Sequence, residues 1–202
     1  MLMIRMGLIV LTMTVLTACA ATTPALDPKV DLGAFRLGHN VVVASKAQKG
    51  PVSRDATEQE WVSALQGAVQ QRFGRYEGNQ LYHFGISVEG YLLAPPGVPV
   101  VYKPRSALIV NVTVWDDAAN SKLNPEVEQF TIFESTTSGS FILGSGYQRT
   151  KEQQMAGLAA NAMREIEEWM LEKKASEGWF EPRAGAATEA RVLPPGAVAP
   201  EE

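Results

Sequence analysis

The chain has 202 residues and a formal net charge of −4 at pH 7, which fits a single domain with flanking tails. Its acidic balance and the absence of a Lys/Arg cluster make nucleic acid a poor partner. Cys19 is the only cysteine, so no intrachain disulfide can form and the stability must come from packing.

Residues 1–18 are predicted to be a lipoprotein signal peptide. Arg5 precedes an apolar run, Met6 to Val15, that is shorter than the ~20 residues a membrane span needs. Leu16 to Cys19 reads Leu-Thr-Ala-Cys, like a bacterial lipobox, and predicts lipid attachment to the thiol of Cys19. An ordinary secretory signal with an incidental cysteine is the alternative. Ala20, in place of an aspartate, favours the periplasmic face of the outer membrane.

Cleavage before Cys19 would leave 202 − 18 = 184 residues. Residues 19–34 are expected to be the lipidated amino terminus and a tether, because the stretch from Ala20 to Asp31 is rich in small residues and contains prolines. We expect one domain over residues 35–180. From residue 181 to 202 the chain is rich in Ala, Gly, Pro and Glu and is predicted to be a disordered tail.

The predicted domain begins with a strand at residues 40–44, where Val41 to Val43 suggest burial on both faces and a central place in the sheet. A helix is expected over residues 57–73. Thr57 and Glu60 form a capping box at its start, and Gly74 predicts a left-handed cap at its end. Its apolar stripe consists of Trp61, Leu65, Val69 and Phe73.

Alternating apolar residues predict strands over residues 81–92, 107–115 and 127–134. A short fifth strand over residues 140–144 is also possible. The last helix is expected over residues 151–174, with a capping box formed by Thr150 and Gln153. Its glutamates predict a solvated face; they are Glu165, Glu167, Glu168 and Glu172.

The element order β-α-β-β-β-(β)-α predicts an α+β fold, a two-layer sandwich. The first β-α-β unit is expected to be a right-handed parallel crossover and the remaining strands a meander. The sheet would be mixed, mostly antiparallel, with four to five strands and both helices on one face.

A polar sheet face is the first candidate for a binding surface. With both helices on one face, the other carries His83, Glu89 and Asn111. Solvated antiparallel sheets look like this without any function, so a plain solvent-facing surface is the alternative. His83 and Glu89 are about 20 Å apart along a strand and cannot form a catalytic pair directly.

The segment from Ala94 to Pro104 is the second candidate, because it contains four prolines and yet several apolar residues. Val98, Val100 and Tyr102 are its candidate partner-binding residues. A loop folded back on its own domain is the alternative.

Catalytic and metal-binding patterns are poorly represented. The sequence has no Gly-x-Ser-x-Gly elbow, two histidines and no His-x-x-x-His or cysteine pair, so we expect neither a catalytic set, a metal site nor a cofactor. Asp116 and Asp117 could hold a cation, but a hydrated turn is the better interpretation.

The lipobox and the segments at residues 81–91, 112–117 and 145–155 resemble a family of uncharacterised lipoproteins from Rhodobacter-like alphaproteobacteria, over about residues 35–180. This resemblance implies an envelope location and no particular activity. At the level of fold, the chain is also similar to small envelope lipoproteins that assist transport or assembly machines.

Three functions remain open. The leading hypothesis is a non-enzymatic envelope lipoprotein that binds a protein partner as an accessory or assembly factor. The second is a carrier of a small amphiphile, such as a lipid or glycan fragment, with Trp61, Phe73, Met155 and Trp169 lining a cavity between helices and sheet. The third and weakest is a hydrolase that uses His83.

Overall fold

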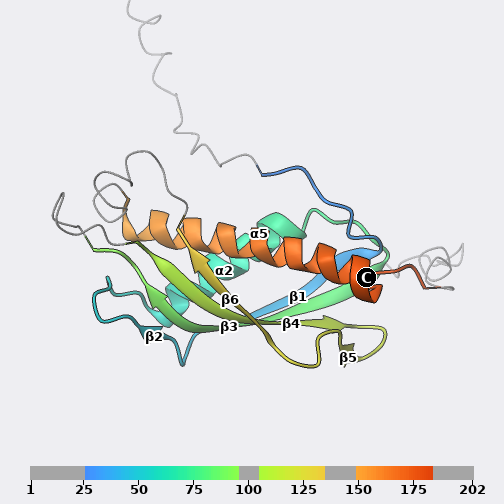
Figure 1. The fold of residues 1–202 in the computed structure, drawn as a ribbon, viewed down its shortest axis with the longest axis horizontal. Helices are drawn as coiled ribbons and strands as arrows, with labels where there is room; N and C mark the ends of the chain where they lie inside the picture. Colours follow the sequence, from blue (N-terminus) through green and yellow to red (C-terminus); the bar gives the residue numbers. More distant parts are fainter. Residues whose placement is uncertain (1–25, 96–104, 135–148, 184–202) are drawn as a thin grey trace, which may run out of the picture.

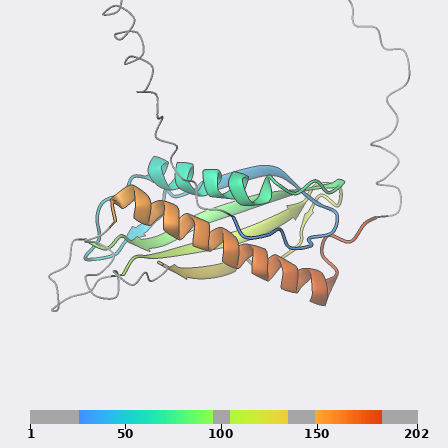
Figure 2. The same ribbon diagram turned by 90° about the horizontal axis from the view of Figure 1, so that it is seen from above.

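The computed structural model describes residues 26–95, 105–134 and 149–183 (Figure 1). These residues form β1 (Phe35–Val43), β2 (Gln48–Lys49), α2 (Glu58–Phe73), β3 (Gln80–Leu92), β4 (Ala107–Asp116), β5 (Ser121–Lys122), β6 (Glu128–Phe133) and α5 (Lys151–Glu177). The predicted α+β two-layer sandwich is confirmed, with a mixed sheet on one side and both helices on the other (Figure 2). The predicted strand at residues 140–144 lies outside the described residues.

The sheet is built around β3 and β4, which pair antiparallel over ten residue pairs from Tyr82–Asp116 to Leu92–Ala107. On one side β1 and β2 pair with β3 in parallel, and on the other side β5 and β6 pair antiparallel with β4. The first β-α-β unit is therefore parallel and the remaining strands form a meander, as predicted. The two-residue strands β2 and β5 only extend this pairing at the ends of β3 and β4.

The prediction for the first strand is wrong in its limits and in its position. β1 starts five residues earlier than expected, and it lies at the edge of the sheet. Val42 is buried beneath the helices, but Val41 and Val43 are 58% and 47% exposed on the other face. An uninterrupted valine run can alternate between buried and exposed positions, because β-branched residues suit strands whether or not both faces are covered.

Both helices begin as their sequences indicate. The Thr57 hydroxyl accepts the backbone N–H of Glu60, whose carboxylate accepts the Thr57 backbone N–H, and Thr150 and Gln153 form the same box on α5. Gly74, expected to be left-handed, instead has φ −65°. The left-handed cap belongs to Gly178, with φ 71°, which ends α5 three residues later than predicted.

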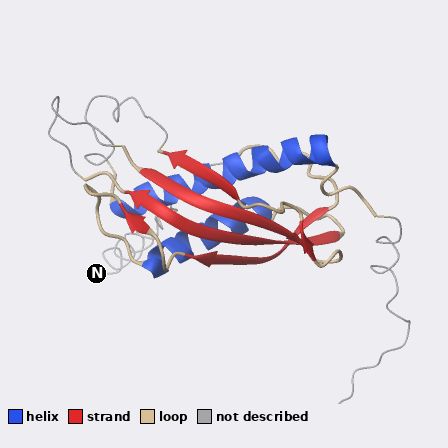
Figure 3. Ribbon diagram, turned by 60° about the horizontal axis from the view of Figure 1, so that its bottom comes forward, coloured by secondary structure: helices blue, strands red, loops and turns tan. Residues whose placement is uncertain are grey.

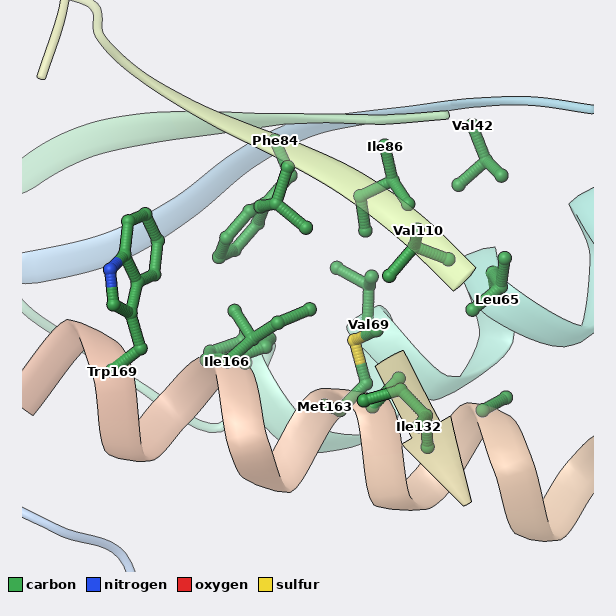
Figure 4. Close-up of a cluster of buried hydrophobic side chains, with 14 of the residues drawn as sticks. Val42, Leu65, Val69, Phe84, Ile86, Val110, Ile132, Met163, Ile166 and Trp169 are labelled. Carbon is green, nitrogen blue, oxygen red and sulfur yellow. The ribbon is translucent and has the colours of Figure 1, made fainter. Parts of the chain in front are cut away.

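The core lies between the sheet and the two helices (Figure 4). Phe84, Ile86 and Val110 point from the sheet toward Leu65 and Val69 of α2. From α5, the side chains that meet the same cluster are Met163, Ile166 and Trp169. Alternate residues of β3 and β4 are buried, as the predicted alternation requires.

The flanking segments pack closer to the domain than a tether and a tail would. Leu32 is buried, and the backbone N–H of Ala34 donates to the Phe180 carbonyl at 2.9 Å. Lys174 donates to the Asp31 carboxylate at 2.7 Å, and Gln80 donates to the Glu181 carbonyl at 2.8 Å. The predicted tether through residue 34 is therefore too long, since residues from 27 onward bind the helices and the end of the sheet. The predicted tail also begins too early, because residues 181–183 contact the domain.

Candidate functional site

The face of the sheet that the helices leave uncovered is the larger candidate surface (Figure 3). Its middle is polar, as predicted: Asn111 accepts a hydrogen bond from Gln129 across β4 and β6 at 3.1 Å. Each of its two edges also carries exposed apolar side chains. Val41 and Val43 stand on β1, and Phe133, which is 55% exposed, stands at the end of β6. These residues were not singled out from the sequence, because the valine run indicated burial on both faces and Phe133 was not distinguished within the predicted strand at residues 127–134.

His83 is tied into its own domain. Its Nδ1 accepts the backbone N–H of His39 at 2.8 Å, so this nitrogen carries no proton and Nε2 donates to Asp117 Oδ1 at 2.9 Å. The ring also stacks on His39, with 5.0 Å between the ring centroids. With both nitrogens engaged, neither is free to act as a general base toward a bound substrate.

The other predicted partner-binding residues are placed unevenly. Asn111 lies at the centre of the open face, opposite Ser87 of β3 and Gln129 of β6. Glu89 lies at a register shift between Val88 and Gly90. It is near the carboxyl-terminal end of β3, whereas His83 is near the amino-terminal end of the same strand. Val98, Val100 and Tyr102 lie outside the described residues, as does Cys19.

The side chains expected to line an amphiphile cavity pack as core. Trp61 lies against Tyr91 with 5.3 Å between ring centroids, and Phe73 lies against Phe84 at 4.8 Å. Trp169 contacts the rings of Phe130 and Trp179. Met155 is the exception, because it also borders a hollow on the outer surface of the helical layer.

That hollow is a groove of about 620 Å³ between α2 and α5. Its lining is mostly small and apolar and includes Ala64, Gly67, Ala68, Met155, Ala156 and Ala160. The sequence carried a signal for it, because these alanines and the glycine recur at spacings of three and four residues, which place them along one side of each helix. At the amino-terminal ends of the helices, Lys151 of α5 forms an ion pair with Glu60 of α2.

A buried ionic cluster lies at the other end of the helix pair. The Glu167 carboxylate accepts from Arg72 at 3.0 Å, from Arg75 at 2.9 Å and from the Tyr76 hydroxyl at 2.6 Å. Burial and the hydrogen bond to Glu167 raise the pKa of Tyr76 to about 12, so its hydroxyl remains a donor at neutral pH. Glu167 is 2% exposed, and the prediction that it belongs to a solvated face is wrong.

The two arginines also hold the amino-terminal segment. Arg72 donates to the Asp27 carboxylate at 3.1 Å, and Arg75 donates to the Asp27 carbonyl at 2.6 Å. Arg75 is in turn bound through its own carbonyl, which accepts from Lys29 at 3.2 Å. Residues 27–29 are therefore fixed against the carboxyl-terminal end of α2.

Asp116 is not in a hydrated turn. It is 1% exposed, accepts the backbone N–H of Ala119 at 2.9 Å, and is held by both terminal nitrogens of Arg183. Burial alone would raise the pKa of this carboxyl, but the Arg183 guanidinium and the backbone N–H of Ala119 hold it below its ordinary value. The pair therefore fastens the end of the described chain to the end of β4, and Arg183 occupies both oxygens of Asp116.

Replacing Arg183 with alanine is expected to lower the free energy of unfolding near neutral pH by about 1–2 kcal/mol, a small loss because this guanidinium is partly exposed. In the native protein the stability from this pair is present above the ordinary Asp116 pKa of 3.8 and is lost as the pH falls through the lowered value. Without Arg183 this contribution is absent and the protein starts from a lower free energy of unfolding, so acid unfolding followed by circular dichroism should begin at a higher pH. Glu181→Ala, which keeps the backbone carbonyl bound by Gln80, should leave the acid midpoint unchanged; an equal shift would contradict this account.

The described residues were also considered for membrane-spanning helices and for groups of metal-binding side chains. Within the described residues, no helix is both long enough and apolar enough to cross a bilayer. Among these residues, no three His, Cys, Asp or Glu side chains are grouped as a bound metal ion would require.

Comparison with known proteins gives distant structural similarities. No family model and no curated protein matches the chain. A Xanthomonas campestris protein of the DUF330 family model is 13% identical, with a TM-score of 0.41 over 71% of this chain and 87% of its own. The PelC dodecamer protein of Paraburkholderia phytofirmans is 9% identical, with a TM-score of 0.31 over 68% and 94%.

A minor lipoprotein of Acinetobacter baumannii is 16% identical, with a TM-score of 0.25 over 61% of this chain and 93% of its own. Proteins named as lipoproteins are thus among the solved structures that this chain resembles. These three TM-scores are all below 0.5, so we base no functional assignment on the similarities. The resemblance to a Rhodobacter-like family remains a prediction.

Proposed function

We propose that the protein is a non-enzymatic, lipid-anchored protein of the bacterial envelope that binds a protein partner through the open face of its sheet. In this proposal Cys19 carries the lipid and holds the domain at the periplasmic face of the outer membrane. The domain acts there as an accessory or assembly factor. Neither a cofactor nor a metal ion enters the proposal.

The apolar edges of the open face carry the proposal. Val41, Val43 and Phe133 are each about half exposed, although side chains of this kind gain about 1.5–3 kcal/mol when they are fully buried. They flank the polar strip of His83, Asn111 and Glu89. An apolar rim around a hydrogen-bonding centre is a surface that a partner could cover with both packing and polar contacts.

The state of His83 supports a binding role over a catalytic one. Its ring is held by a backbone N–H and by a carboxylate, and its principal contacts are internal. Such a fixed ring presents a preorganised surface, which lowers the entropy cost of association. The hydrolase hypothesis would instead require one of these hydrogen bonds to be broken.

The experiment is site-specific crosslinking in intact cells followed by pull-down from detergent. The native protein is compared with the double variant Val43→Lys/Phe133→Lys, which places a charge at each edge of the sheet. We expect a discrete partner with the native chain and its loss with the double variant, because a buried unpaired lysine opposes association. Leu171→Lys on α5 is the matched control, since Leu171 is 37% exposed on the other layer.

The anchor is tested separately with Cys19→Ala. The native protein should partition with the membrane fraction and carry the mass of its acyl chains, and the variant should lose both, because each buried methylene contributes about 0.8 kcal/mol to membrane attachment. Retention of a partner by Val43→Lys/Phe133→Lys would reject the binding face. An unchanged membrane fraction in Cys19→Ala would reject the anchor alone.

A further inference from the structure

The groove between α2 and α5 continues a path that the amino-terminal segment already follows. From Asp31, bound to Lys174, the segment reaches Asp27, bound to Arg72 and lying beside Glu167. It thus runs from the carboxyl-terminal ends of both helices toward their amino-terminal ends. Figure 2 shows it between the two helices, and the groove begins one residue beyond Arg72, at Gln71.

We propose that residues 20–25 of the chain lie along this groove in an extended conformation. The groove covers α2 from Gln59 to Gln71, about 18 Å of helix at a rise of about 1.5 Å per residue. Six extended residues cover about 20 Å. The segment that precedes Leu26 therefore has the length to fill the groove without crossing it.

The chemistry of the segment fits the lining. Residues 20–25 read Ala-Ala-Thr-Thr-Pro-Ala, with small side chains and no charge. The floor of the groove is alanine and glycine, and a Cβ atom added at Gly67 would meet no other atom within 4 Å. A segment of bulky or charged residues would not lie flat there. Pro24 favours an extended backbone in the residue before it.

The fixed position of Asp27 also determines which residues of α2 each residue of the docked segment would lie beside. Thr23 is four residues before Asp27, about 13 Å farther along an extended chain. That distance equals about nine helical residues, so it places Thr23 beside Ser63 and Ala64. Cys19 would then lie near the amino-terminal ends of both helices, where Lys151 and Glu60 are paired. The open sheet face would be on the opposite side of the domain.

Engineered cysteine pairs test this register in the full-length protein extracted in detergent. Thr23→Cys with Ala64→Cys should form an intramolecular disulfide under mild oxidation, because docking would bring the two Cα atoms to within about 6 Å. The control pair is Thr23→Cys with Gln66→Cys. Gln66 is two residues along the same helix but faces β1, where it donates to the Asn40 carbonyl. Peptide mapping by mass spectrometry identifies the sulfurs that are joined and separates them from Cys19.

A second experiment places a bulky side chain in the groove and measures the reactivity of a thiol in the docked segment. In the single variant Thr23→Cys, docking should slow the reaction of the thiol with a maleimide, and adding Gly67→Trp should raise the rate severalfold. Gln70→Trp is the matched control and should leave the rate unchanged, because Gln70 is exposed on the side of α2 that borders Arg36 and Leu37 of β1. Circular dichroism establishes that each variant is folded.

The proposal is overturned if the Ala64 and Gln66 pairs crosslink equally, if neither crosslinks, or if Gly67→Trp leaves the maleimide rate unchanged. Disulfides formed between two molecules would assign the groove to a second copy and would also overturn it. These readouts do not depend on the lipid or on a partner, so they are independent of the proposed function.

Discussion

Replacing Glu167 with alanine is expected to lower the free energy of unfolding by about 3–5 kcal/mol. The substitution removes the acceptor of three hydrogen bonds and leaves the guanidinium of Arg72, whose side chain is only 7% exposed, without its buried counterion. Asp27 still faces Arg72, but its own side chain is 62% exposed and compensates poorly. Urea denaturation followed by circular dichroism measures the change.

Glu168→Ala is the control, because Glu168 is the adjacent residue and faces solvent. We expect it to change the stability by no more than about 0.5 kcal/mol. Equal effects of the two substitutions would show that the buried cluster does not contribute as described. Amide exchange at residues 27–34 provides a second readout, since Arg72 and Arg75 hold that segment and should release it in Glu167→Ala.

Replacing Phe35 with alanine is also expected to cost about 3–5 kcal/mol, because its ring is fully buried and its removal leaves a cavity. The ring stacks on Tyr82 at 5.6 Å and meets Phe180 at 5.2 Å between centroids. It further contacts the rings of Phe73, Tyr76 and Phe84. The melting temperature and the urea midpoint measure the loss.

Phe133→Ala makes the matched comparison, since the same side chain is lost from a position that is 55% exposed. Its effect on stability should stay within about 0.5 kcal/mol, whereas the proposed function expects it to weaken partner binding. A large loss of stability from Phe133→Ala would mean that this ring supports the fold and does not form a free rim.

The starts of both helices could be predicted to within a residue because their signals are local. A capping box lies within four residues, and the apolar stripe of α2 repeats every four, so both can be recognised in one stretch of sequence. The antiparallel strands were predictable for the same reason. β1 was not, because Gly38 and His39 interrupt its pattern, and the pairing shifts between Leu37 and Asn40.

The charged residues show where sequence patterns stop being informative. Glu167 stands among glutamates that are solvated, and its burial is decided by Arg72, which is 95 residues away. The burial of Asp116 depends in the same way on Arg183, which is 67 residues away. The polar strip of the open face was predictable, since alternation places His83 and Asn111 opposite the core. Its apolar rim and the helix groove depend on which strands become edges and on how two helices pack.

The contacts between residues 31–35 and residues 174–180 join the two ends of the domain, and they affect how the chain folds. Phe35 shares its ring cluster with Phe180, and Asp31 is bound to Lys174, 143 residues later in the chain. Contacts between such distant residues form only after a long loop closes, which slows folding. We expect a nascent or translocating chain to lack its full core until residues near 180 become available. Such a delay would help a polypeptide that crosses a membrane in an unfolded state. Phe35 of the first strand cannot contact Phe180 until synthesis of the domain is nearly complete.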